Sequence, residues 1–357
     1  MKALKYLKKL NDAGFEAYIV GGYVRDYILK IESTDIDITT SATPKEVANI
    51  FNITKADDLG CVNIKNGDLN IDITTYRKEG FYSNRKPKKL VYVKDLRTDL
   101  LRRDFTINTL CMDQNSEIID KLNGFKDLES KTLRVVGSVK KKFKDDPLRM
   151  LRALRLSIVL DFKIEDSALA FIISNKKLLK SLSYDRVKEE ISKILISKNA
   201  PEGFNVLKML GILDVLDIEY NDLVFCDDLI GMWAQLEYSD NYRFSKAQSA
   251  RIKNIRYIIK NGKIDEKIIF KYGLYDSIVA AKILGISEKK LIKMHESMLV
   301  HTPKDLKIDG NTIKRVLSIE KNPKIKKIKE TLINEILNNN LENNEDDLVE
   351  YILKKWK

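Results

Sequence analysis

One stretch, residues 17–40, constrains the fold of this chain more than any other. It begins with an apolar run at 17–20 that predicts a buried strand, and it passes through Gly21 and Gly22 into a segment that predicts a helix. The sequence Asp-Ile-Asp-Ile at 35–38 then alternates with a period of two, which predicts a second strand with both carboxylates on one face. We therefore expect a strand, turn, helix, strand unit at the start of an α/β domain.

The paired carboxylates of this stretch predict a metal site. Asp35 and Asp37 would repel each other on one strand face unless a cation neutralises them. Ligands made only of oxygen suit Mg²⁺, which takes part of its coordination shell from substrate phosphates. A turn at Gly22 lets backbone N–H groups approach a polyphosphate at the positive end of the following helix, where Arg25 adds a cation. On these residues alone, a solvated strand face remains the alternative.

Composition limits the class of protein. A chain of 357 residues is long enough for more than one hydrophobic core, and its formal net charge of +12 suits a polyanionic partner such as nucleic acid, although a Lys-rich codon bias would give the same charge. Three scattered cysteines and two histidines argue against a zinc site or a disulfide framework, so we expect a reducing compartment, the cytoplasm. No apolar run has membrane-spanning length, and no membrane partner is expected.

Further strand candidates and a basic segment follow. Residues 61–64 and 69–74 predict two strands, the second with Asp72 on its polar face, where it either completes the metal site or is simply solvated. Residues 77–93 combine glycine, proline, basic and aromatic side chains. This composition is typical of a surface loop, and it also suits a basic lid over a nucleotide and an RNA end.

Two later motifs place charged side chains at the start of helices. Leu-Arg-Arg-Asp-Phe-Thr-Ile-Asn at 101–108 contains Arg103 and Asp104, and residues 145–155 begin a helix at a proline with carboxylates in its first turn. In the second motif, acidic and basic residues share one helix face at a spacing of three. Considered without context, an ordinary capped or salt-bridged surface helix would show the same pattern of charged residues.

Together these motifs resemble those of the class II tRNA nucleotidyltransferase and bacterial poly(A) polymerase family, within the polymerase β nucleotidyltransferase superfamily. The resemblance also includes residues 120–128, which we expect to be structural, and 182–190. In the latter, we expect Ser183 or Asp185 to cap a helix that runs to Leu195 and braces the helix after Pro147. It implies an α/β head on a mixed five-stranded sheet, followed by a helical neck, body and tail. The expected ranges are 1–138 for the head, 139–200 for the neck, 201–275 for the body and 276–357 for the tail.

The resemblance also implies an activity, the addition or repair of the 3′-terminal CCA of tRNA from CTP and ATP. Asp35 and Asp37 would hold two Mg²⁺ ions, one activating the terminal 3′-OH and the other stabilising the departing pyrophosphate. The incoming base would be selected by hydrogen bonds to one carboxylate and one guanidinium. The residues implied to bind the nucleotide are Gly22, Arg25, Arg103, Asp104, Asp146, Arg149, Arg152 and Arg155.

The chain departs from the family pattern in a few places, and alternatives stay open. Asp145 and Asp185 replace the usual Glu, which we expect to alter only helix capping or fine positioning. Segment 77–93 resembles that of enzymes that add all three nucleotides. Poly(A) polymerases of the family tend to carry longer basic C-terminal extensions, whereas this sequence ends soon after Trp356, so we expect CCA addition. An A-adding enzyme or poly(A) polymerase is the first alternative, and a non-catalytic RNA-binding protein is a remote one. The lysines at 321–329 form either a solvated helix face or a contact for the tRNA backbone.

Overall fold

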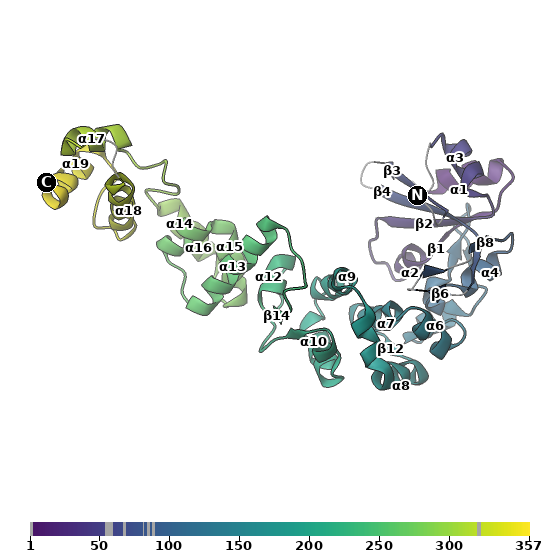
Figure 1. The fold of residues 1–357 in the computed structure, drawn as a ribbon. Coiled ribbons are helices and arrows are strands. Elements are labelled where there is room, and N and C mark those ends of the chain that lie inside the picture. The colour runs from purple at the N-terminus through teal and green to yellow at the C-terminus, as the bar shows by residue number, and fades with distance from the viewer. Residues whose placement is uncertain are drawn as a thin grey trace. The chain divides into compact units, whose positions relative to one another are not determined.

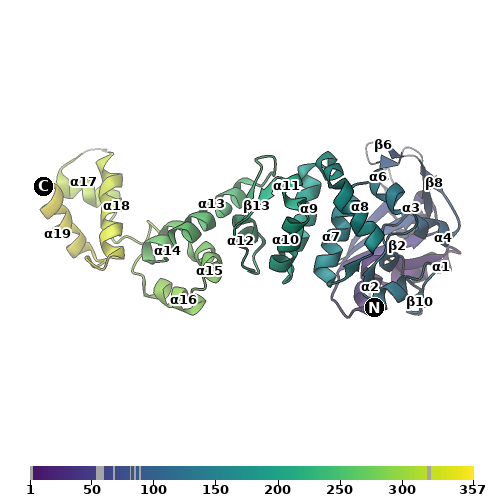
Figure 2. The same ribbon diagram turned by 90° about the horizontal axis from the view of Figure 1, so that it is seen from below.

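The chain folds into two compact units, Met1–Asp217 and Ile218–Lys357, in a computed structural model drawn in Figures 1 and 2. The division into head, neck, body and tail at 138, 200 and 275 stays a prediction. The residues that the structure describes are 3–53, 60–66, 69–80, 82–83, 86–87, 90–319 and 323–357.

A mixed sheet forms the core of the first unit, as the sequence predicts. Its strand order is β10-β9-β1-β2-β4-β3, and the neighbours β2 and β4 are parallel while the other pairs are antiparallel. The sheet has six strands where five were expected, because the short strand β10 pairs with β9 at one edge. The strands are β1 (Ala17–Val20), β2 (Asp35–Thr40), β3 (Cys61–Asn66), β4 (Leu69–Thr75), β9 (Cys111–Met112) and β10 (Ile118–Ile119).

Helices with one apolar face cover this sheet. The first helix buries Tyr6, Leu7 and Leu10, and it lies beside α3 in Figure 1. Helix α3 begins at Pro44 behind a capping box in which Thr43 accepts a hydrogen bond from the N–H of Glu46. The helical elements of the first unit are α1 (Leu4–Asp12), α2 (Gly22–Ile28), α3 (Pro44–Phe51), α4 (Leu96–Leu101), η1 (Thr106–Asn108), α5 (Gly124–Glu129), α6 (Val139–Asp145), α7 (Leu148–Leu160), α8 (Asp166–Asn175), η2 (Lys176–Ser181), α9 (Tyr184–Leu195), α10 (Ala200–Met209) and α11 (Ile212–Val215).

The turn at 120–128 braces the segment that contains η1, in agreement with the structural role expected for it. The Asp120 carboxylate accepts hydrogen bonds from the backbone N–H groups of Leu122, Gly124 and Phe125. A Cβ on Gly124 would lie 2.3 Å from the carbonyl oxygen of Thr106, so only glycine allows the two backbones to approach this closely.

The part after the sheet is mostly helical, as expected, and contains two strand pairs that were not predicted. Two short strand pairs interrupt it, β11 (Thr132–Leu133) with β12 (Lys163–Ile164), and β13 (Ile218–Glu219) with β14 (Glu237–Tyr238). Their two-residue length explains why periodicity in the sequence did not reveal them.

The second unit is a stack of helices around its own apolar core. Leu291, Ile328, Leu332 and Leu348 are fully buried there. Within the described residues, no helix is long and apolar enough to cross a membrane. The helices are α12 (Leu229–Ala234), α13 (Lys246–Asn261), α14 (Glu266–Tyr272), α15 (Leu274–Ile283), α16 (Glu288–Ser297), α17 (Gly310–Leu317), α18 (Lys324–Leu337) and α19 (Glu345–Trp356).

Candidate active site

The carboxylates of β2 lie as the alternating sequence predicts. Asp35 and Asp37 are exposed, whereas Ile36 and Ile38 between and after them are buried. In the parallel pairing of β2 with β4, Asp37 lies directly opposite Asp72. The strands therefore gather three acidic side chains on one region of the sheet.

Asp72 lies beside Asp37, but its carboxylate is already hydrogen-bonded to another side chain. Its Oδ1 accepts a hydrogen bond of 2.6 Å from Nδ2 of Asn63 on β3. Among the described residues, no group of three or more His, Cys, Asp or Glu side chains is placed to hold a metal ion. Asp35 and Asp37 thus remain as a pair of carboxylates, and Asp72 contributes negative charge beside them.

The electrostatics of Asp37 reflect this crowding of like charges. The side chain reaches solvent, but protein atoms surround it closely, and the resulting desolvation raises the pKa of Asp37. The Arg103 guanidinium opposes the rise, while the negative charges of Asp72 and Asp35 add to it. Negative charge at this position is therefore only partly compensated by the protein, which is the situation that a bound cation would relieve.

The glycine turn before α2 lies against these side chains. Gly21 has φ of 84°, a conformation that favours glycine, and a Cβ there would lie 3.3 Å from Oδ2 of Asp37 and 3.5 Å from Nη1 of Arg103. At Gly22 the added Cβ would make only an ordinary contact, 3.7 Å from Nη2 of Arg25. The sequence emphasised Gly22, but the strict need for glycine falls on Gly21.

Arg103 is positioned by Asp99, a residue that the sequence analysis did not single out. Asp99 is fully buried, and Oδ2 accepts from Arg103 Nη2 at 3.4 Å while Oδ1 accepts from Arg102 Nε at 2.8 Å. The same carboxylate accepts from Thr39 Oγ1 on β2 and from the backbone N–H of Arg77. Its signal in the sequence was weak, because an acid four residues before an arginine is common on helices.

A buried polar network joins the glycine turn to the segment at 101–108. Arg25 is 8% exposed, donates to Asp26 Oδ1 through Nε and Nη2, and donates to Oδ1 of Asn108 at 2.9 Å. Nδ2 of Asn108 in turn donates to Oδ1 of Asp104 at 3.1 Å. Arg25 is therefore held rigidly, with most of its surface covered by protein.

The network continues from Asp104 into α7 and α9. Arg152 donates to Oδ2 of Asp104 through Nε at 2.7 Å and Nη2 at 2.6 Å, and Arg155 Nε donates to Oε2 of Glu190 at 2.6 Å. A longer ion pair of 4.0 Å links Arg152 to Glu190. Glu190 was not predicted as a site residue, yet it is the residue through which α9 braces α7, whereas Ser183 occupies the N-cap of α9 without a side-chain cap.

The charges of this network are mutually dependent. Burial alone would raise the pKa of Asp104, but Arg152 and the hydrogen bonds from Asn108 and the Phe105 N–H lower it below its usual range. The Asp104 carboxylate likewise raises the pKa of Arg152 against the opposing effect of burial. Both side chains are therefore charged at neutral pH.

The first turn of α7 holds the two residues expected to read the base. Asp146 precedes the helix, and its Oδ1 accepts from the N–H of Leu148 at 3.2 Å. Arg149 donates from Nη1 to the carbonyl oxygen of Lys142 at 3.1 Å. Both side chains are half-buried, and Arg149 lines a pocket of about 350 Å³ together with Asp145 and Arg102.

The basic segment at 77–93 is only partly described. It contains β5 (Arg77–Glu79) paired with β8 (Leu90–Tyr92), and β6 (Tyr82–Ser83) paired with β7 (Lys86–Pro87). The lid interpretation depends on side chains of this segment that lie outside the described residues. Residues 320–322, at the start of the lysine-rich stretch in the tail, also lie outside them.

Comparisons with known proteins agree with this architecture. A poly A polymerase head domain model matches residues 17–134, a model described as "Probable RNA and SrmB- binding site of polymerase A" matches 161–220, and a tRNA nucleotidyltransferase domain 2 model matches 241–352. The carboxylate face and the sheet that carries it therefore define a nucleotidyltransferase.

Relatives along the whole chain narrow the class. The CCA-adding enzyme of Ligilactobacillus salivarius is 30% identical over 98% of this chain and 95% of its own, and that of Limosilactobacillus reuteri is 31% identical over 97% and 94%. The fold matches the Bacillus stearothermophilus CCA-adding enzyme, solved in complex with CTP, with a TM-score of 0.86 and 24% identity over 99% of this chain and 96% of that one. The chain belongs to the family of CCA-adding enzymes.

The raised pKa of Asp37 predicts a trade-off between stability and function. Because the folded-state pKa lies above the unfolded value, folding is favoured with the carboxyl protonated, and this contribution is lost as pH rises through the folded pKa. We therefore expect Asp37→Asn to raise the melting temperature at pH 7 in EDTA while abolishing nucleotide incorporation. Asp240→Asn, at an exposed position in the second unit, is the control, and a lower melting temperature for Asp37→Asn would contradict the assignment.

The Asp104 and Arg152 pair should behave as one unit in a double-mutant cycle. Asp104→Asn leaves the half-buried guanidinium of Arg152 with only its longer ion pair to Glu190, so we expect a loss of about 1–3 kcal/mol in the free energy of unfolding. Adding Arg152→Met to that variant should restore part of the loss. Denaturant unfolding of the two single variants and the double variant measures this, and strictly additive losses would refute the coupling.

Proposed function

We propose that this chain adds the 3′-terminal CCA to tRNA from CTP and ATP, on the face of β2 that carries Asp35 and Asp37. One observation supports this site above others: a partly buried polar network runs from Arg25 through Asn108 and Asp104 to helix α7 and Glu190. Strand β2 is tied to Arg103 separately, because Thr39 and Arg103 share the carboxylate of Asp99. Phosphate binding and base reading both require fixed geometry, and this network holds their elements in one frame.

The carboxylate pair fits magnesium. Enzymes of this family use a divalent metal ion, and Asp35 and Asp37 offer exposed oxygen ligands with excess negative charge. When bound, Mg²⁺ would increase the nucleophilicity of the tRNA 3′-OH and stabilise charge on the pyrophosphate. Asp72 raises the local negative potential and keeps its hydrogen bond to Asn63.

Arg103 is the residue that we assign to the nucleotide phosphates. Its guanidinium lies beside Asp37 and Gly21, and its Nε is buried without a hydrogen-bond partner among the described residues. A buried N–H without an acceptor is unfavourable, and a phosphate or ribose oxygen would satisfy it. Gly22 would contribute backbone N–H groups from the turn, and Asp104 would help to fix the ribose. Arg25, whose charge is paired with Asp26, would hold the turn in place beside the nucleotide.

Base selection is assigned to the first turn of α7. The Asp146 carboxylate can accept from the exocyclic amine that cytosine and adenine share, and Arg149 can donate to the adjacent ring acceptor. Guanine and uracil present a carbonyl at the amine position, so the same pair would reject them. Arg152 and Arg155, fixed by Asp104 and Glu190, would support this pocket from the next two turns of the helix.

We place this activity in the cytoplasm, in keeping with three cysteines that form no disulfide in the structure.

The proposal is tested by incubating the purified protein and Mg²⁺ with tRNA ending at the discriminator base, at C, or at CC, with each nucleoside triphosphate separately. Two C additions followed by one A are expected. Addition of A only to tRNA ending in CC, or long A tails, would replace the proposal with A-adding or poly(A) activity.

Replacing Arg149 should weaken discrimination between bases. Because a paired base contact contributes roughly 1–3 kcal/mol of discrimination, we expect Arg149→Ala to reduce the preference for CTP over UTP by about tenfold or more. Arg243→Ala, at an exposed arginine in the second unit, is the matched control. Competition assays with mixed triphosphates give the ratio of kcat/KM values, and an unchanged ratio would reject the role of Arg149.

A further inference from the structure

A cationic pocket of about 350 Å³ lies beside the carboxylate site in the first unit, between α4 and α6. We call it the α4–α6 pocket. The charged side chains that line it are five cations and one carboxylate: Lys78, Arg102, Lys141, Lys142, Arg149 and Asp145. Such a concave surface with a strong excess of positive charge attracts anions. Only Arg149 among these cations belongs to the site described above.

Two neighbouring arginines connect the pocket to the catalytic face. Both are held by the buried carboxylate of Asp99, through Oδ1 for Arg102 and Oδ2 for Arg103. Arg103 lies next to Gly21, near the Asp37 carboxylate, whereas Arg102 lines the pocket. The Asp99 carboxylate therefore holds both arginines, one beside Asp37 and the other in the wall of the pocket.

The walls of the pocket are tied together by hydrogen bonds. Lys142 Nζ donates to the carbonyl oxygens of Leu101 at 2.7 Å and Arg103 at 2.8 Å, which links α6 to the end of α4. The carbonyl oxygen of Lys142 accepts from Arg149 of α7. The pocket is thus preformed, and the proposed base-reading arginine forms part of its wall.

We propose that the α4–α6 pocket binds a backbone phosphate of the RNA strand that is being extended, close to its 3′ end. This inference rests on the proposed function. The nucleotide's own phosphates are drawn to Arg103 and the metal ligands on β2, so a second cationic pocket that shares a wall with the base-reading turn suits the strand that receives the new residue. Phosphate contacts of this kind fix register without reading sequence.

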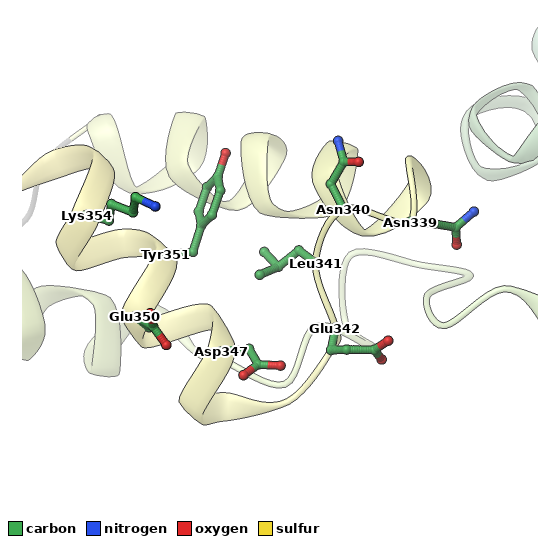
Figure 3. A pocket seen from close by; sticks show the side chains of 8 residues that line it. All are labelled: Asn339, Asn340, Leu341, Glu342, Asp347, Glu350, Tyr351 and Lys354. Atoms are coloured by element: carbon green, nitrogen blue, oxygen red, sulfur yellow. The ribbon is translucent and has the colours of Figure 1, made fainter.

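A larger pocket in the second unit is unsuited to the same ligand. Figure 3 shows this pocket, of about 370 Å³, with its side chains coming from α19 and from the preceding loop. Glu342, Asp347 and Glu350 line it together with one lysine, Lys354, so its charge would repel a phosphate.

The test uses lysines that are exposed and lie outside the catalytic assignments. Lys141→Ala removes one pocket cation, and Lys140→Ala and Lys144→Ala remove the same charge from the same helix but outside the pocket. We expect Lys141→Ala to raise the Kd for tRNA ending in CC by roughly three- to tenfold, and to reduce the slope of log K against log salt by about one unit. The KM for CTP and for ATP should stay unchanged, as should all values for the two control variants.

The outcomes separate the pocket from the overall function. Binding of tRNA is measured by filter retention without turnover, so it reports on the pocket independently of activity. If the wild-type protein added no nucleotide, that result would overturn the proposed function and leave the binding measurement as the test of the pocket. A rise in KM for CTP with an unchanged Kd for tRNA would assign the pocket to the nucleotide and overturn the inference. Equal effects on the Kd in pocket and control variants would mean that only the general surface charge attracts tRNA, and this would also overturn the inference.

Discussion

The ion pair between Asp104 and Arg152 is the interaction on which the arrangement of the site depends. It connects the segment after α4 to helix α7, and through Asn108 and Glu190 it extends to α2 and α9. Both charges are largely covered by protein, so removing either one leaves the other poorly solvated, and the two-point contact favours one relative placement of these elements. The sheet supplies the carboxylates, and this pair holds α7, the helix proposed to read the base, against the segment that follows α4.

The site combines two opposite electrostatic regimes a short distance apart. The charges of Asp104 and Arg152 are balanced within the protein, whereas Asp37 is surrounded by further acids and only partly compensated by Arg103. Balanced groups suit a structural role because their protonation does not change near neutral pH. Unbalanced groups are expected where the missing charge belongs to a metal ion or a substrate.

The sequence predicted the fold class, the two strands of the opening unit and the helix that begins after Pro147, because strict alternation and helix-start signals are local. It could not predict the sixth strand or the two-residue strand pairs, since elements that short carry no period. Asp99 and Glu190 were missed for a different reason. Each looks like an ordinary acid on a helix face. Only the tertiary structure shows that Asp99 is buried against Thr39 of β2 and that Glu190 is buried against Arg155 of α7.

Asp99 also links strand β5 to the two arginines that follow α4. Its carboxylate accepts from the backbone N–H of Arg77, the first residue of β5, as well as from Arg102 and Arg103. One side chain therefore sets the relative positions of three segments. A substitution at Asp99 would free all three at once, although it touches neither of the paired carboxylates on β2.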